Sequence, residues 1–153
     1  GEILIGGHSA GVGTRCNFMY VPQGNTLMSG SVRDNLLLAN ENATEEQMKA
    51  ALHTAVADFV FDLPEALETH CSEKGAGFSE GQAQRIAIAR ALLHRGGILI
   101  LDEATSAVDP ETERKLLENL SAGYHGKKTI LFISHREAVT KVADASLAIS
   151  DLG

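Results

Sequence analysis

Several residue types and patterns are scarce or missing in this sequence of 153 residues. It has only two cysteines, Cys16 and Cys71, and they lack C-x-x-C spacing. Two such thiols are too few for a structural zinc site, so we interpret them as reduced thiols. No apolar run approaches the roughly 18 residues of a membrane span, and no basic and then apolar segment marks a signal peptide. We therefore expect the chain by itself to be soluble.

Positive charge is also scarce. Lys and Arg together number 13 against 20 Asp and Glu, which gives a formal net charge of −7. A negatively charged chain is a poor match for a broad nucleic-acid surface, so we expect no nucleic-acid partner. Hydrophobic residues make up 44% of the sequence, which is enough for one globular domain with its own core.

The first motif of interest is GHSAG at residues 7–11, directly after the apolar residues 3–5. A strand followed by G-x-S-x-G is typical of the nucleophile elbow of hydrolases. That motif requires a helix straight after the serine, but the following AGVGTRCN shows no helical period. We therefore interpret Ser9 as a turn residue and disfavour acyl-transfer chemistry.

Two apolar runs, residues 98–101 and 129–133, each end in polar residues. Such continuous runs predict parallel strands, and for residues 98–101 we expect burial on both faces. The first run is followed by Asp102 and Glu103, the second by Ser134 and His135. Ligands bind at the carboxyl edge of open parallel sheets, where one acid can hold a hydrated Mg²⁺ and another can polarise a water. Residues 2–5 and 18–21 predict two further strands.

Helix starts are marked by paired capping residues. Ser79 and Gln82 have capping-box spacing before an apolar face that ends at residues 94–97, and Thr44 with Gln47 shows the same pattern. Asp109 before Pro110 predicts a further helix start, and Ser134 with Glu137 predicts another. Because a helix start attracts anions, Ser79 begins a candidate anion site.

Four segments together resemble the nucleotide-binding domain of ABC transporters. FSEGQAQRIAIARALL (78–93) is similar to the signature motif, ILILDEATSAVD (98–109) to the Walker B strand and D-loop, ISH (133–135) to the H-loop, and YVPQ (20–23) to the Q-loop. They occur in the family's order, and LMSGSVRDNL (27–36) resembles the exporter branch. Such a combination is far more specific than any single short motif.

The resemblance implies an α/β fold of the P-loop NTPase (RecA-like) kind. In it, a mainly parallel sheet is flanked by helices and carries an inserted α-helical signature subdomain. Residues 1–24 and 97–153 would belong to the catalytic core, and residues 25–96 to the helical subdomain with its signature helix.

The resemblance also implies roles for individual residues. At the chain's own ATP these would be Gln23 (Mg²⁺ and attacking water), Asp102 (Mg²⁺), Glu103 (general base) and His135 (γ-phosphate). Ser79, Gly81 and Gln82 would bind the γ-phosphate of ATP held by a second, head-to-tail domain, and Asp109 would cross that interface. The implied ligands are ATP and Mg²⁺. The implied partners are that second domain and transmembrane domains, which Glu73 would approach, at the cytoplasmic face of the cell membrane.

Three departures from the family pattern stand out. Glu80 replaces a usual glycine, and Val108 replaces the usual leucine of the D-loop. There is also no phosphate loop, because the sole Gly-Lys pair, Gly126–Lys127, is followed by Lys128 and lacks the first glycine of G-x-x-x-x-G-K-[ST]. We therefore expect an N-terminally truncated domain that lacks the central Walker A strand, with a weakened fold and no ATP hydrolysis by this chain alone.

Two function classes remain open at this stage. The first is the ATP-hydrolysing motor domain of an exporter-type ABC transporter. The second is a degenerate or regulatory module that supplies only its signature helix to a partner's ATP. An ABC protein that acts on DNA or ribosomes is disfavoured by the acidic charge. The sequence does not identify a transported substrate.

Overall fold

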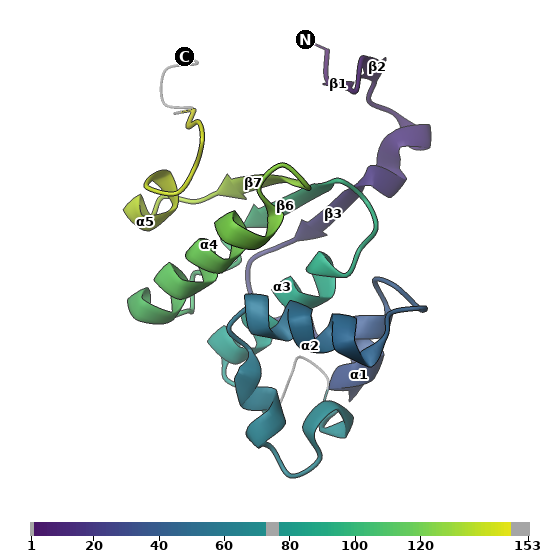
Figure 1. The fold of residues 1–153 in the computed structure, drawn as a ribbon, viewed down its shortest axis with the longest axis vertical. Coiled ribbons are helices and arrows are strands. Elements are labelled where there is room, and N and C mark those ends of the chain that lie inside the picture. The colour runs from purple at the N-terminus through teal and green to yellow at the C-terminus, as the bar shows by residue number, and fades with distance from the viewer. Residues whose placement is uncertain (1, 73–76, 148–153) are drawn as a thin grey trace.

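The structure is a computed structural model that describes residues 2–72 and 77–147. Its centre is a three-stranded parallel sheet in the order β3–β6–β7, formed by Phe18–Val21, Ile98–Asp102 and Thr129–Ile133. Val21 pairs with Leu101, and Asp102 pairs with Ile133. The strands predicted at 18–21, 98–101 and 129–133 are confirmed, and these three strands lie side by side in Figure 1.

Two small antiparallel pairs accompany this sheet. β1 (Leu4–Ile5) pairs with β2 (His8–Ser9), and β4 (Gly30–Ser31) pairs with β5 (His70–Cys71). Gly6 and Gly7 form the turn of the first pair with φ values of 55° and 83°, a conformation that glycine adopts without a steric penalty. The interpretation of Ser9 as a turn residue is therefore wrong, because the turn lies two residues earlier and Ser9 belongs to β2.

The segment that follows Ser9 contains no α-helix. Residues Val12–Asn17 form a 3₁₀ helix, η1, and the Ser9 hydroxyl donates a hydrogen bond to the Glu2 carboxylate. The structure thus lacks the strand–serine–helix arrangement of a nucleophile elbow, as the sequence indicated.

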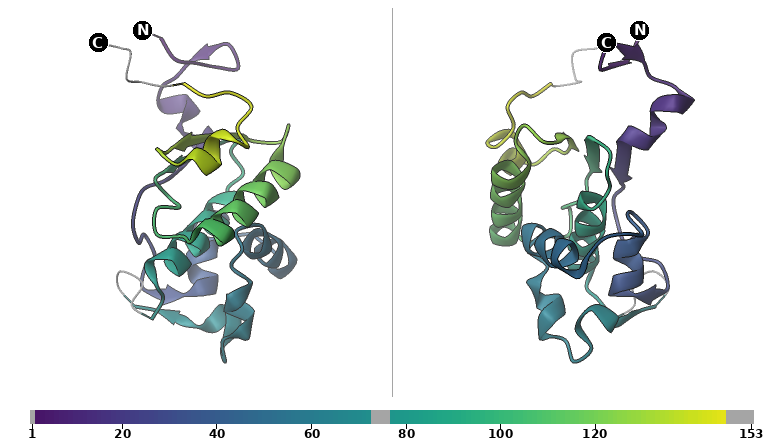
Figure 2. Two further views of the ribbon diagram at one scale, coloured as in Figure 1. Left: turned by 90° about the vertical axis from the view of Figure 1, so that its left-hand side faces the viewer. Right: turned by 45° about the vertical axis from the view of Figure 1, so that its right-hand side comes forward.

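The helices begin mostly where the capping residues predict. α2 (Glu45–Thr54) has the Thr44–Gln47 capping box, α3 (Glu80–Leu92) the Ser79–Gln82 box, and α4 (Pro110–Tyr124) the Asp109 cap. A short helix, α1 (Val32–Leu37), and the 3₁₀ helices η2 (Asp58–Asp62) and η3 (Ala66–Glu68) complete the helical region. Figure 2 shows α1, α2 and these 3₁₀ helices at the end of the molecule away from both termini.

The helix start predicted at Ser134 is wrong. α5 spans only Glu137–Thr140, and its N-cap is Arg136, without a side-chain cap. The Ser134 hydroxyl instead accepts a hydrogen bond from the Arg136 N–H at 3.1 Å. This bond spans two residues rather than three and forms a tight turn, so the helix begins later.

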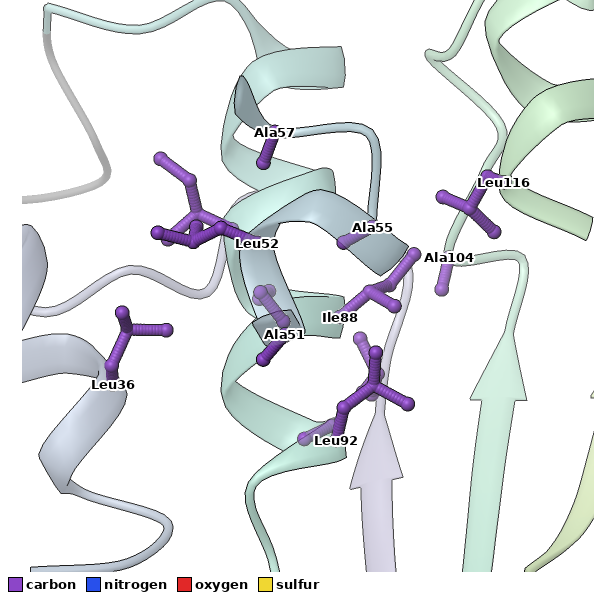
Figure 3. Close-up of a cluster of buried hydrophobic side chains, with 14 of the residues drawn as sticks. Leu36, Ala51, Leu52, Ala55, Ala57, Ile88, Leu92, Ala104 and Leu116 are labelled. Carbon is purple, nitrogen blue, oxygen red and sulfur yellow. The ribbon is translucent and has the colours of Figure 1, made fainter. Parts of the chain in front are cut away.

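The core fills the space between one face of the sheet and the helices. Figure 3 shows Leu36 of α1, Leu52 of α2 and Ile88 of α3 within this cluster, with Ala104 and Leu116 on its sheet side. The sheet residues that face the core alternate with residues on an open face. Those packed in or against the core are Met19, Val21, Leu99, Leu101, Ile130 and Phe132.

The open face of the sheet corrects one expectation. Tyr20, Leu131 and Ile133 are 51%, 49% and 52% exposed, and β6 alternates between half-buried and buried residues. The prediction that residues 98–101 are buried on both faces is therefore wrong. The apolar residues of β6 that alternate with its core residues lie on this open face, which the described helices leave partly exposed.

Candidate functional site

The carboxyl ends of the three parallel strands gather the residues predicted to act at the chain's own nucleotide. Gln23 follows β3, Asp102 ends β6 with Glu103 directly after it, and His135 lies two residues beyond β7. The pairing of Val21 with Leu101 and of Asp102 with Ile133 brings these ends to the same edge of the sheet. This edge is where open parallel sheets bind ligands.

At this edge, Glu103 and His135 contact each other directly. Glu103 Oε1 lies 2.8 Å from His135 Nδ1, and the Glu103 N–H donates to the Ile133 carbonyl at 2.9 Å. The Glu103 side chain is 20% exposed, whereas the His135 side chain is 84% exposed. The pair therefore places an acceptor carboxylate and an exposed imidazole side by side at the carboxyl ends of β6 and β7.

The backbone of Glu103 is strained. Its φ is +49°, in the left-handed region that costs a residue other than glycine about 1–2 kcal/mol. Such conformations cluster at functional sites because the surrounding structure must hold them. Here the hydrogen bond from the Glu103 N–H to Ile133 ties the strained residue to β7.

Asp102 has a partner that the sequence analysis did not identify. The Tyr20 hydroxyl donates a hydrogen bond to Asp102 Oδ2 at 2.6 Å, and this bond raises the pKa of the Tyr20 phenol above its ordinary value. Tyr20 pairs with Ile100, so it shares the open face of the sheet with Asp102. The two-residue period of the strands is the signal from which this contact could have been predicted.

The start of α3 holds the second group of predicted residues. The Ser79 hydroxyl accepts from the Gln82 N–H at 3.2 Å, and the Ser79 N–H donates to Gln82 Oε1 at 2.9 Å. Gly81 is buried, and a Cβ added to it would lie 2.5 Å from the Ala107 carbonyl oxygen. Gly81 therefore allows α3 to approach the backbone of residues 105–108.

Asp109 caps α4 at an exposed position. Its Oδ1 accepts from the Thr112 N–H at 3.0 Å, and this hydrogen bond holds the pKa of the Asp109 carboxyl below its usual range. Within the described residues, no direct hydrogen bond or ion pair joins Ser79, Gly81, Gln82 or Asp109 to the Glu103–His135 edge. The structure thus places the predicted site residues in two separate groups.

The donor atoms at this edge suit Mg²⁺ better than a transition metal, which would need a cage of several protein ligands. Among residues 2–72 and 77–147, no group of three or more His, Cys, Asp or Glu side chains could hold a metal ion. Mg²⁺ needs only one or two carboxylates, because it keeps waters and binds substrate phosphates. Asp102 and the amide oxygen of Gln23 are donors of this type at one edge.

Three further observations concern regions away from this edge of the sheet. A cavity of about 250 Å³ is bounded by α4, β7 and residues 142–145, and none of the predicted site residues lines it. Glu73, the residue expected near transmembrane helices, lies outside the described residues. Across the part of the chain that the structure describes, no helix is long and apolar enough to cross a bilayer.

Comparison with known proteins gives consistent matches. The family model described as ABC transporter matches residues 1–106. The chain is 42% identical over 149 residues to the cyclolysin secretion/processing ATP-binding protein CyaB of Bordetella pertussis (strain Tohama I), with 94% of the chain and 21% of the relative covered. Identity and coverage are the same for the leukotoxin export ATP-binding protein LtxB of Aggregatibacter actinomycetemcomitans.

A solved structure shows the same fold. It is a bacterial Atm1-family ABC exporter with ATP bound, and it matches with a TM-score of 0.81 and 32% identity. The match covers 94% of this chain and 26% of the exporter chain. Our chain thus spans about a fifth of the length of the curated relatives described above.

Proposed function

Since this chain belongs to the ABC transporter family, we propose that it forms part of the ATP-hydrolysing motor domain of an exporter. The intact protein would couple ATP hydrolysis in a head-to-tail dimer to transport across a membrane. The observation that carries this proposal is the Glu103–His135 pair, 2.8 Å apart at the edge where Asp102 ends β6. The relatives named for toxin secretion and export support the exporter class.

The residues at the edge of the sheet would divide the work at the chain's own nucleotide. Asp102 and Gln23 would hold Mg²⁺, which supplies charge neutralisation to the phosphates when bound. Glu103 would accept the proton of the attacking water, since its carboxylate is the acceptor beside the exposed His135 imidazole. His135 would contact the γ-phosphate from its exposed position.

The second group of residues would serve the ATP of the partner domain. The capping box engages the side chains of Ser79 and Gln82 together with the Gln82 N–H. A phosphate at this helix start would therefore meet the N–H groups of Glu80 and Gly81, or it would displace the capping box. Glu80 is exposed, so its carboxylate can point away from such a phosphate.

The nucleotide pocket would need a further part of the intact protein to which this chain would belong, which we call the parent protein. This sequence contains no phosphate loop, and the open face with Tyr20, Leu131 and Ile133 leaves apolar surface for another element to cover. We propose that the parent supplies the phosphate loop together with the transmembrane domains. Residues 1–24 and 97–153 would complete its catalytic core at the cytoplasmic face of the membrane, and residues 25–96 its helical subdomain.

The test uses a matched pair of substitutions in the parent protein. Glu103→Gln is expected to lower ATP hydrolysis by about 10²–10⁴-fold, the usual contribution of a general base. Glu118→Gln, which removes a carboxylate that pairs with Arg114 on the exposed side of α4, should leave the rate unchanged. Equal rates for both variants and the wild type would contradict the assignment of Glu103.

A second experiment tests whether ATP binding by this chain depends on a phosphate loop from elsewhere in the parent protein. Isothermal titration of this chain with MgATP should give no micromolar binding. Micromolar affinity that Asp102→Ala alters would contradict the proposed dependence on another segment. If the parent also lacks a phosphate loop, the regulatory module that lends only its signature helix is favoured instead.

A further inference from the structure

The backbone of residues 105–108, which connects β6 to α4, is held by the signature helix on one side. Gln84 of α3 donates from Nε2 to the Ser106 hydroxyl at 3.0 Å and accepts from the Ala107 N–H at 3.1 Å. Gln84 is 1% exposed, so both bonds lie in a setting where unpaired polar groups are costly. The close approach at Gly81 brings the helix against the same segment.

The other side of this segment is held by the residue that follows His135. Arg136 donates from Nη2 to the Ser106 carbonyl at 3.0 Å and from Nη1 to the Val108 carbonyl at 3.2 Å. The same Nη1 lies 2.8 Å from Glu113 Oε2. One guanidinium therefore binds two carbonyls of the segment and a carboxylate of α4.

Glu113 explains why the guanidinium is needed there. Its side chain is 3% exposed, and its second oxygen accepts from the Thr105 hydroxyl at 2.6 Å. A carboxylate this deeply buried requires a charged partner and hydrogen bonds, because an unpaired buried charge is costly. Gln84, Glu113 and Thr105 are three of the buried polar residues among those described, and all contact this one segment or belong to it.

The network joins the two groups of site residues. It starts beside His135, which contacts Glu103, and runs through residues 105–108 to Asp109 and to the start of α3. We propose that Arg136 and Gln84 are positioning residues that hold residues 105–108 as a rigid bridge. The bridge keeps the Glu103–His135 pair, for the chain's own ATP, in a set arrangement with Asp109 and the helix start, for the partner's ATP. This inference rests on the proposed function.

The bridge is tested first in this chain by amide hydrogen exchange. Arg136→Met and Gln84→Met keep side-chain bulk but remove the hydrogen bonds to residues 106–108. Both are expected to speed exchange of the amides of these residues by about tenfold more than exchange of the amides of β6, which reports the loss of global stability when Glu113 loses its charged partner. Arg114→Met, which removes an arginine that pairs with Glu111 on the exposed side of α4, should change neither set.

Arg136→Lys keeps the charge opposite Glu113, so it covers the case in which the methionine variant fails to fold. It should restore part of the protection of residues 106–108. Unchanged exchange at residues 106–108 in both the Gln84 and Arg136 variants would overturn the bridge. Acceleration that is equal at β6 would also overturn it, since that pattern reports only a loss of global stability.

The second measurement is ATP hydrolysis by a parent protein that contains a phosphate loop. Arg136→Met should lower kcat about tenfold with KM for ATP unchanged, because the nucleotide contacts stay intact while the catalytic geometry loosens. Arg136→Lys should recover part of kcat, and Arg114→Met should match the wild type. A wild-type kcat in folded Arg136→Met would overturn the positioning role. If the wild-type parent protein hydrolyses no ATP, the proposed function is overturned instead. The hydrogen-exchange experiment would then still test whether Arg136 and Gln84 hold residues 105–108.

Discussion

The substitution of alanine for glycine should have opposite effects at two helix positions of this chain. At Gly81 an added Cβ would lie 2.5 Å from the Ala107 carbonyl oxygen and 3.2 Å from its carbonyl carbon. Ordinary contact begins at 3.4 Å, so α3 and residues 105–108 must separate by most of an ångström. Overpacking of this kind costs about 1–3 kcal/mol.

Helix propensity partly offsets the clash at Gly81. Alanine is favoured over glycine by up to about 1 kcal/mol within a helix, so Gly81→Ala should destabilise the chain by about 1–2 kcal/mol. For a domain of this size that corresponds to a melting temperature lower by about 2–8 °C. Separation of the two elements would also stretch the hydrogen bonds between Gln84 and residues 106 and 107.

Gly123 in α4 is the matched control. A Cβ added there meets nothing within 4 Å, so only the propensity gain remains. Gly123→Ala should stabilise the chain by about 0.5–1 kcal/mol. Thermal unfolding followed by circular dichroism at 222 nm measures both variants. If Gly81→Ala is as stable as the wild type, Gly81 is not needed for the close approach that the structure shows.

Three further predictions concern single side chains. Asp102→Asn should lower the pKa of the Tyr20 phenol toward its ordinary value, as followed by absorbance near 295 nm, because the bond to the carboxylate raises it. Since the raised pKa belongs to the folded state, the stability from this bond is present below about pH 10 and is lost as the pH rises through the folded pKa. Ser79→Ala should lower the free energy of unfolding by about 1 kcal/mol, and an unchanged urea midpoint would argue against its capping box. Exposed Cys16 should react with a thiol reagent in the native chain, whereas buried Cys71, whose thiol pKa is raised by burial, should react only on unfolding; rapid modification of both would contradict this.

Local patterns in the sequence were sufficient to predict the three strands of the parallel sheet and the starts of α2, α3 and α4. The capping boxes at Thr44 and Ser79 depend on bonds that span three residues, so both partners lie within one short window of sequence. The strand at 129–133 is likewise marked by its own apolar run. Ser134 has the same capping spacing, yet its hydroxyl bonds to the N–H of Arg136 instead. Residue spacing alone does not distinguish a capping box, whose hydrogen bond spans three residues, from the tight turn at Ser134, whose hydrogen bond spans two.

Burial on the two faces of a strand depends on what packs against the sheet. The run at residues 98–101 reads as fully buried, but its half-buried residues lie on the same open face as Tyr20 and Leu131. A sequence pattern reports what a strand is suited to, namely burial on both faces. It does not report which segments of a longer protein provide the cover, and the curated relatives described above are about five times as long as this chain.

The candidate site shows the same division between local and long-range information. The order of strand and acid placed Asp102 and Glu103 at an edge, and the Glu103–His135 contact follows from the adjacency of β6 and β7. By contrast, Gln84 and Arg136 stand 52 positions apart and meet only through residues 105–108. No sequence period or spacing predicts either contact, because each side chain binds a backbone segment from another part of the chain. A polar residue within a buried helix face is the one local sign at Gln84, since such a residue needs a partner that the helix itself does not supply.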